Sequence, residues 1–335
     1  MTTTRVIVIV VTTLLATSVA LATSAGAQTM ITELDATVGA STEDVEAAAT
    51  QLRIFGEGPA KWRFYVEGTW ADVWGPESDA FGSAFPYNDR LRPMEVFAEK
   101  TVTRQRFLVG TRLGRYRTPF GLYSRSDHGY AGFLRAPLIR YGDYWALSNN
   151  FLETGASVLA GTSRLQAEVS LGIPQDEDEQ HRRRGLDRVA RLQGSFGTVI
   201  VGTSYIHTQP TKERPWATGS TEFTGLDARW MMGGVQVRGE WLDGRSFSGT
   251  RTFGGYADVI IHPRFMGPVT AVARAERLDY VAGPFSSYPR RYTAGARIRL
   301  ASMLIAHVNV LHGSAYESER RQSAVDVALT FTARR

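Results

Sequence analysis

Two stretches of the chain, RLQAEVSL at residues 164–171 and RYTAGARIRL at residues 291–300, decide the fold class. In both, apolar or small side chains alternate with polar ones. A period of two places successive side chains on opposite faces, so each stretch is predicted to be a β-strand with one apolar and one polar face. A soluble sheet would bury the apolar face. A membrane barrel would turn it to lipid and keep the polar face around a wet lumen.

Similar stretches recur from about residue 60 to the C-terminal end. Strands are predicted near residues 61–72, 93–101, 105–113, 152–161, 163–173, 186–196, 198–208, 222–232, 234–243, 253–262, 269–279, 291–300, 303–312 and 322–332. Most are about ten residues long, which suits a tilted strand that crosses a bilayer. Short and long connections alternate along the series, as in barrels with short periplasmic turns and longer external loops. We predict an all-β, transmembrane, antiparallel up-and-down β-barrel of about fourteen strands, with twelve and sixteen as alternatives.

The first 60 residues do not follow this pattern. Arg5 precedes an apolar stretch from Val6 to Ala22, and Ala25-Gly26-Ala27 is typical of a signal-peptidase site. An uncleaved anchor is the alternative, which the length of the stretch permits. Ser41-Thr42-Glu43-Asp44, before an alanine-rich run, indicates a capped short helix. We predict a signal peptide at 1–27, a periplasmic lead-in or small plug at 28–60, and the barrel at 61–335.

The composition narrows the chemistry. The chain has no cysteine, so disulfides, thiol catalysis and cysteine-based metal sites are excluded. Its formal net charge is +5, but 33 acidic residues interleave with 38 basic ones, without the one-signed stripe that a nucleic acid would need. The sequence shows no metal-ligand spacing and no phosphate-binding glycine motif. We predict no metal, no cofactor, no catalytic residue and no nucleic-acid partner.

The polar face of the predicted strands carries charges of both signs. A charged side chain on the lipid face costs about 2–4 kcal/mol near the midplane, so a barrel needs its charges confined to one parity. The residues predicted to line the lumen are Arg106, Arg112, Glu153, Glu168, Arg191, Asp227, Arg229, Arg238, Glu240, Asp258, Arg274, Glu276, Arg297 and Arg299. Two roles fit them: selection of small polar solutes, and bracing of the wall through cross-strand ion pairs.

The connection at residues 114–151 is long, rich in arginine and aromatic residues, and poor in acidic ones. Loops of this length are usually functional or disordered, and the aromatic content argues against disorder. Folded into the pore, this loop would form a constriction lined by Arg115, Arg117, Arg125, Arg135 and Arg140, which would favour anions. The alternative is an external lid with no role in selectivity.

The signal-like N-terminus, the lack of cysteine, the alternating loop lengths and the stretch Arg117-Thr118-Pro119-Phe120-Gly121 resemble bacterial outer-membrane porins, loosely the phosphate-selective group. The resemblance covers residues 60–335. It implies a bacterial outer-membrane location among outer-membrane lipids, passive diffusion of small polar or anionic solutes, and a homotrimer as one assembly. Two features depart from it. Phe331 is followed by four more residues where porins usually end on an aromatic residue, and the lumen lacks the one-signed basic ladder of a phosphate channel.

Three other functions compete with the porin interpretation. A barrel enzyme would need a nucleophile, a base and an orienting group at one rim, and the sequence offers only Asp258 and His262 on one strand face. A non-conducting barrel would act as a scaffold or assembly partner, with its lumen sealed by ion pairs or by residues 28–60. A soluble, exported all-β protein would use the same alternation to build a core.

Overall fold

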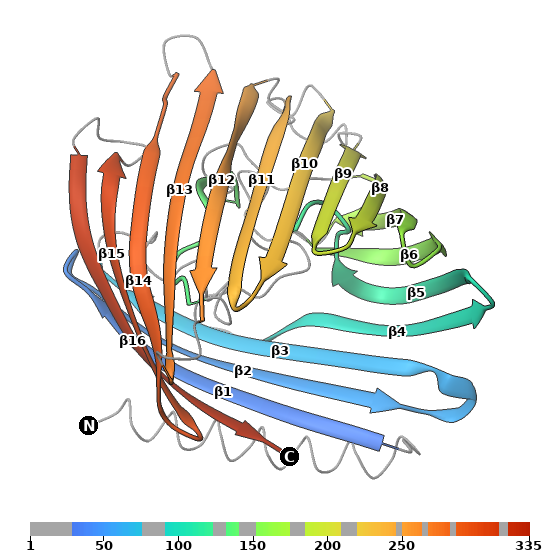
Figure 1. Cartoon of the computed structure of the whole chain (residues 1–335), viewed down its shortest axis with the longest axis horizontal. Helices are drawn as coiled ribbons and strands as arrows, with labels where there is room; N and C mark the ends of the chain where they lie inside the picture. Colours follow the sequence, from blue (N-terminus) through green and yellow to red (C-terminus); the bar gives the residue numbers. More distant parts are fainter. Residues whose placement is uncertain are drawn as a thin grey trace.

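The protein is a single closed β-barrel (Figure 1). The computed structural model describes residues 29–75, 91–122, 132–140, 152–174, 185–208, 220–245, 250–262, 267–281, 286–314 and 321–335. Sixteen antiparallel strands pair in chain order, and β16 pairs with β1 to close the wall. Closure leaves no open sheet edge, which is the condition for crossing a bilayer with strands.

The strands are β1 (Thr29–Ser41), β2 (Val45–Glu57), β3 (Arg63–Trp74), β4 (Arg92–Arg104), β5 (Phe107–Arg117), β6 (Leu152–Gly161), β7 (Leu165–Pro174), β8 (Asp187–Phe196), β9 (Val199–Thr208), β10 (Thr221–Met232), β11 (Val235–Arg245), β12 (Arg251–Ile261), β13 (Val269–Val281), β14 (Arg290–Ala301), β15 (Leu304–Ser314) and β16 (Arg321–Arg334). In the described ranges, two single 3-10 turns accompany them, η1 (Pro59–Lys61) and η3 (Leu138–Arg140). None of the helices in the described ranges is long or apolar enough to span a membrane.

The two faces of the wall are those that the alternation predicts. On β7, Leu165 and Val169 are 53% and 56% exposed, whereas Glu168 between them is 4% exposed. The same contrast holds on β10, where Leu226 is exposed and Asp227 is buried. On these strands the exposed apolar side chains therefore point out of the barrel and the buried carboxylates point into it, the arrangement of a barrel in lipid.

The prediction for residues 28–60 is wrong, because β1 and β2 occupy almost all of this segment. The two strands form a hairpin in which Val38 pairs with Ala48. The run Ala47-Ala48-Ala49 hides the alternation of β2, since alanine does not distinguish the two faces. The expected helix cap is instead a three-residue turn, Thr42–Asp44, in which Asp44 adopts φ of 58°. Short polar residues tolerate this left-handed conformation. The added hairpin raises the strand number from fourteen to sixteen.

Long and short connections lie at opposite ends of the barrel. The connection from β5 to β6 spans residues 118–151, whereas β4 and β5 are joined by two residues, Gln105 and Arg106. Two connections depart from this order. The β1–β2 turn is short but lies at the end of the long connections, and the β11–β12 connection at that end, residues 246–250, is shorter than the β12–β13 connection at the other end, residues 262–268. Next to the seam between β1 and β16, this end of the barrel therefore carries a three-residue turn between β1 and β2 in place of a long loop.

Candidate pore constriction

Part of the β5–β6 connection lies inside the barrel. Its described residues, 118–122 and 132–140, are called the inner loop here. The backbone N–H of Gly121 donates to Ser204 Oγ on β9 at 3.0 Å, and that of Leu134 donates to Asn309 Oδ1 on β15 at 2.8 Å. The inner loop therefore crosses the lumen along the inward face of β9 to β15. In Figure 1 its short ribbon segments lie within the outline of the barrel.

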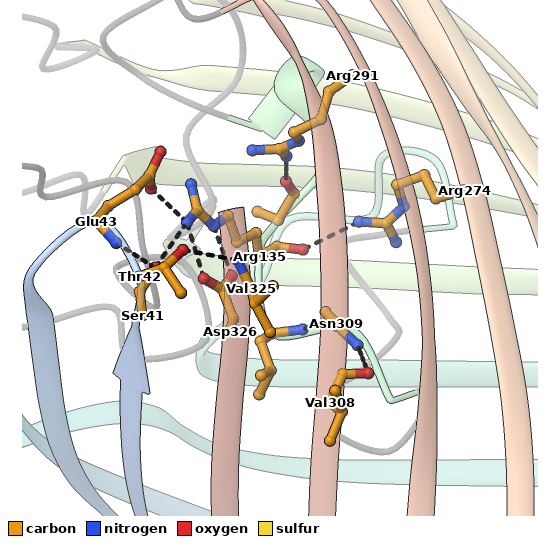
Figure 2. Close-up of polar contacts among 12 residues, drawn as sticks. Ser41, Thr42, Glu43, Arg135, Arg274, Arg291, Val308, Asn309, Val325 and Asp326 are labelled. Atoms are coloured by element: carbon orange, nitrogen blue, oxygen red, sulfur yellow. Dashed lines mark hydrogen bonds and ion pairs between the residues drawn. The ribbon is translucent and has the colours of Figure 1, made fainter. Parts of the chain in front are cut away.

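Arg135 fastens the inner loop at the seam of the barrel. Its Nε and Nη2 donate to Asp326 on β16 at 2.7 and 2.9 Å, and Nη2 also donates to Glu43 in the β1–β2 turn at 2.6 Å. Figure 2 shows the guanidinium between these two carboxylates. The Asp326 side chain is fully buried, so the pair is shielded from water. Charge-assisted, bidentate bonds of this kind fix geometry as well as adding attraction.

Two arginines on the wall hold the backbone of the inner loop. Arg274 Nη1 donates to the carbonyl of Arg135 at 3.0 Å, and Arg291 donates to the carbonyl of Ala136. Each guanidinium also forms an ion pair, Arg274 with Asp258 at 2.6 Å and Arg291 with Glu276 at 2.7 Å. Figure 2 shows both arginines reaching from their strands toward the loop. The wall therefore supplies hydrogen-bond donors to buried carbonyls of the inner loop.

At the other end of the inner loop, Arg140 is buried. Its Nη2 donates to Glu240 on β11 and, at 3.3 Å, to the carbonyl of Phe120. The guanidinium lies 5.7 Å from the centre of the Phe120 ring. Arg140 is therefore compensated by a buried carboxylate and ties two parts of the loop together.

The inner loop also buries an apolar cluster inside the barrel. Phe120, Leu138 and Ile139 pack against inward side chains near one end of β8 to β13. The wall residues of this cluster are Val189, Ile206, Phe223, Leu242, Tyr256 and Leu278. Gly225 makes room for the Phe120 ring, because a Cβ at this position would lie 2.7 Å from its Cζ. Burial of apolar surface stabilises by about 25 cal/mol per Å², so the loop is held by apolar packing as well as by ion pairs.

An open cavity lies beside the inner loop, between β1–β3 and β14–β16. Its volume is about 550 Å³, and Phe133 and Leu134 of the loop form part of its wall. The charged residues around it are Glu33, Asp35, Arg53, Arg297, Arg299 and Arg334. Arg53 pairs with Asp35 at 3.0 Å and Arg334 pairs with Glu33 at 3.3 Å. The acidic residues lie on β1, and Arg297 and Arg299 lie on β14, so the cavity carries opposite charges on different parts of its wall.

Known structures share this architecture. OmpF of Salmonella typhi, solved in complex with daunomycin, superposes with a TM-score of 0.66 at 10% identity, over 92% of this chain and 98% of that chain. An anion-selective porin from Comamonas acidovorans gives 0.59 at 13% identity, over 91% and 99%. A triple mutant of the Rhodopseudomonas blastica porin gives 0.51 at 12% identity, over 91% and 99%. The chain has the fold of the bacterial porins. No family model and no curated protein sequence matches it.

Within this porin fold, most of the residues predicted to line the lumen point inward and form ion pairs or hydrogen bonds. The Arg191 guanidinium donates to both oxygens of Asp227, at 2.5 and 2.8 Å. Arg238 and Arg274 both pair with Asp258, at 3.0 and 2.6 Å. The remaining contacts join Arg112 to Glu99, Ser157 to Glu168, Ser170 to Glu153, Arg140 to Glu240 and Arg291 to Glu276. Arg229 lies opposite Arg238 in the register of β10 and β11, and Arg297 and Arg299 line the open cavity.

Four of the predicted positions differ from expectation or cannot be placed. Arg106 is exposed in the β4–β5 turn and does not stand on the wall. Arg115 and Arg117 belong to β5, because the strand continues four residues beyond the predicted end at 113. Arg115 lies opposite the exposed Val96, on the outward face. Arg117 bonds to Glu67 and Glu95, at 3.2 and 3.1 Å. Arg125 lies outside the described residues.

Sequence reasoning missed the apolar cluster and the partners of the inner loop. The sequence does carry a signal for the cluster. Val189, Ile206 and Phe223 are apolar residues at positions of three successive strands where the alternation would place polar, lumen-facing side chains. The partner of Arg135 could not be found in this way, because Asp326 is 191 residues away. In the described part of the chain, no group of three or more histidine, aspartate or glutamate side chains is placed to hold a metal ion.

Proposed function

We propose that the protein is an outer-membrane porin that passes small polar or charged solutes by passive diffusion. The observation that carries this proposal is the closed wall, apolar outside and charged inside, with an open cavity beside the inner loop. An apolar exterior matches the bilayer core, and a charged interior keeps the lumen wet. The proposal includes export through a signal peptide at 1–27 and needs no cofactor or catalytic group. A homotrimer, as in the trimer form of Vibrio cholerae OmpT, is proposed as its assembly.

The finer proposal is that the channel prefers anions. We attribute this preference to arginines of the wall and not, as the sequence predicts, to those of the loop. The loop residues Arg135 and Arg140 are each compensated by buried carboxylates, so they add little net charge to the lumen. The open cavity is lined by four arginines and two carboxylates. Rings of fixed charge set ion selectivity in pores. Arg297 and Arg299 on β14 are therefore the proposed source of the preference.

The test is single-channel recording of the refolded chain in a planar lipid bilayer. Discrete conductance steps with an anion-selective reversal potential across a salt gradient are expected. Steps with cation selectivity or none would retain the channel and remove the anion preference. A folded barrel that inserts and never conducts would contradict the channel function itself.

A non-conducting barrel is the second candidate, and one observation favours it. The inner loop is fastened from β9 to β16 by hydrogen bonds and buried packing, which narrows the lumen along much of its wall. In that case the barrel would act as a scaffold or assembly partner. Vesicle-swelling assays separate the two candidates, because a porin admits small sugars and amino acids at once and a sealed barrel admits neither.

A further inference from the structure

Three aromatic side chains stand side by side on the inward face of neighbouring strands. Phe55 on β2 is the register partner of Tyr65 on β3, which is the partner of Phe97 on β4. The ring centres are 4.8 Å apart for the first pair and 5.2 Å apart for the second. Tyr116 on β5 continues the row, with its ring 6.5 Å from Phe97 and perpendicular to it. We call Phe55, Tyr65 and Phe97 the aromatic row.

The aromatic row faces the lumen and not the lipid. Phe55 and Tyr65 share the parity of Arg53 and Glu67, both of which are buried inside the barrel. The Tyr65 hydroxyl donates to Glu67, which fixes the row to the polar interior. These rings are separate from the apolar cluster that the inner loop covers. Phe55 is 40% exposed, so apolar ring surface is presented to the lumen. Packing of the loop therefore gives no reason for this row.

Charged groups of both signs surround the rings. Arg63 and Glu99 pair at 3.0 Å, and Arg112 donates to Glu99 at 3.1 Å. The Arg112 guanidinium stands 4.7 Å from the Phe97 ring centre, close enough for a cation–π contact. Glu57, the register partner of Arg63, adds a second carboxylate, so the two guanidiniums and two carboxylates carry no net charge. The site therefore offers hydrogen-bond donors and acceptors with little attraction for a bare ion.

A cavity opens over the aromatic row. Its volume is about 340 Å³, within the usual range of small-molecule sites, about 300–1,000 Å³. The side chains that line it include Ile31, Phe55, Arg63, Tyr65, Phe97 and Glu99. It lies at the ends of the strands joined by short connections, since Arg63 begins β3 and Glu57, also in its wall, ends β2. A solute that crosses the lumen would meet it near that mouth.

We propose that this cavity is a binding site for a neutral sugar ring. A pyranose has an apolar face of C–H groups that stacks on aromatic rings, and a rim of hydroxyls that both donate and accept. The aromatic row supplies the first surface, and Glu57, Arg63 and Glu99 in the cavity wall supply partners for the second. A purely apolar solute would leave these charged groups without new partners, and a small ion would gain nothing from the rings. The inference rests on the proposed channel only because the lumen must admit the solute.

The test is saturation-transfer-difference NMR of D-glucose with the refolded chain in detergent micelles. Saturation of the glucose ring protons is expected with the unaltered chain. Phe55→Ala and Phe97→Ala should each weaken binding about three- to tenfold, the range expected for loss of one aromatic contact. Phe107→Ala is the matched control, because Phe107 is an exposed aromatic residue on the outward face of β5 and its loss should leave binding unchanged. A heat-dependent gel shift verifies that each variant is folded.

Three results would contradict the sugar site: no saturation of glucose with the unaltered chain, equal weakening by Phe107→Ala, or saturation of benzoate with none of glucose. The last would assign the row to planar aromatic solutes instead. The NMR measurement does not depend on conduction. A chain that binds glucose but passes no current would refute the channel and retain the site, whereas one that conducts without binding would refute the site alone.

Discussion

At the scale of single residues, we expect the position of the inner loop to depend most on Arg135, which bonds to Asp326 and Glu43 at the seam. Replacement by glutamine would leave Asp326 buried without its cation, and breaking a buried pair in this way costs about 3–5 kcal/mol. We expect Arg135→Gln to lower the temperature at which the folded gel band disappears and to increase open-channel current noise. Arg251→Gln is the control, because its pair with Asp243 is exposed on both sides and should change neither quantity. If Arg135→Gln changed neither the gel-shift temperature nor the current noise, the apolar cluster alone would be sufficient to hold the inner loop in place.

Gly225 provides a second test at this scale, because the absence of a side chain at this position in β10 leaves space for the ring of Phe120 from the inner loop. Gly225→Ala would place a Cβ 2.7 Å from the ring of the buried Phe120, and overpacking of this kind costs about 1–3 kcal/mol. Gly68→Ala is the matched control, because its nearest neighbour would be 3.8 Å away. Thermal denaturation followed by the gel shift should separate the two variants. Equal midpoints would mean that Phe120 moves aside at no cost.

At the scale of the element, strand β14 is expected to set ion selectivity. Arg297→Gln combined with Arg299→Gln removes two of the four arginines of the open cavity. Unit charges interact by about 1 kcal/mol at 4 Å in water, so the permeability ratio should shift a few-fold toward cations. Arg290→Gln on the outward face of the same strand should leave the reversal potential unchanged. An equal shift in both variants would place the filter elsewhere, and high salt should reduce the effect.

The elements also show what sequence reasoning can and cannot supply. Strands such as β7 and β14 were predictable because a half-buried strand must alternate, whichever residues lie beside it. The hairpin β1–β2 was missed because Ala47-Ala48-Ala49 carries no such signal. The composition of the loop is enough to predict that it is functional, but not which groups its arginines contact. Arg135 and Arg140 are predicted to face passing solutes, whereas in the structure they bind carboxylates of the wall. Those partners lie on distant strands, and only the register of the closed barrel brings them together.

At the scale of the whole molecule, the register across the seam can be tested directly, because the chain has no cysteine of its own. Val38 and Leu329 are register partners on the outward faces of β1 and β16. Directly opposed residues of antiparallel strands are about 4.5–5.5 Å apart at Cα, which suits a disulfide. Val38→Cys with Leu329→Cys should therefore crosslink under mild oxidation in the folded barrel and change its mobility on a non-reducing gel. Val38→Cys with Val325→Cys, four positions away on β16, should not.

The position of Arg135 at the seam has a consequence for the order of folding. Its two carboxylate partners come from opposite edges of the unclosed sheet, Glu43 from the first hairpin and Asp326 from the last strand. Neither partner is in place beside the other until β16 has met β1. Closing a loop of 191 residues carries an entropic cost that local strand pairing does not. We expect the strands to pair first and the inner loop to settle last, so that a barrel left open at the seam would also have an unfinished interior.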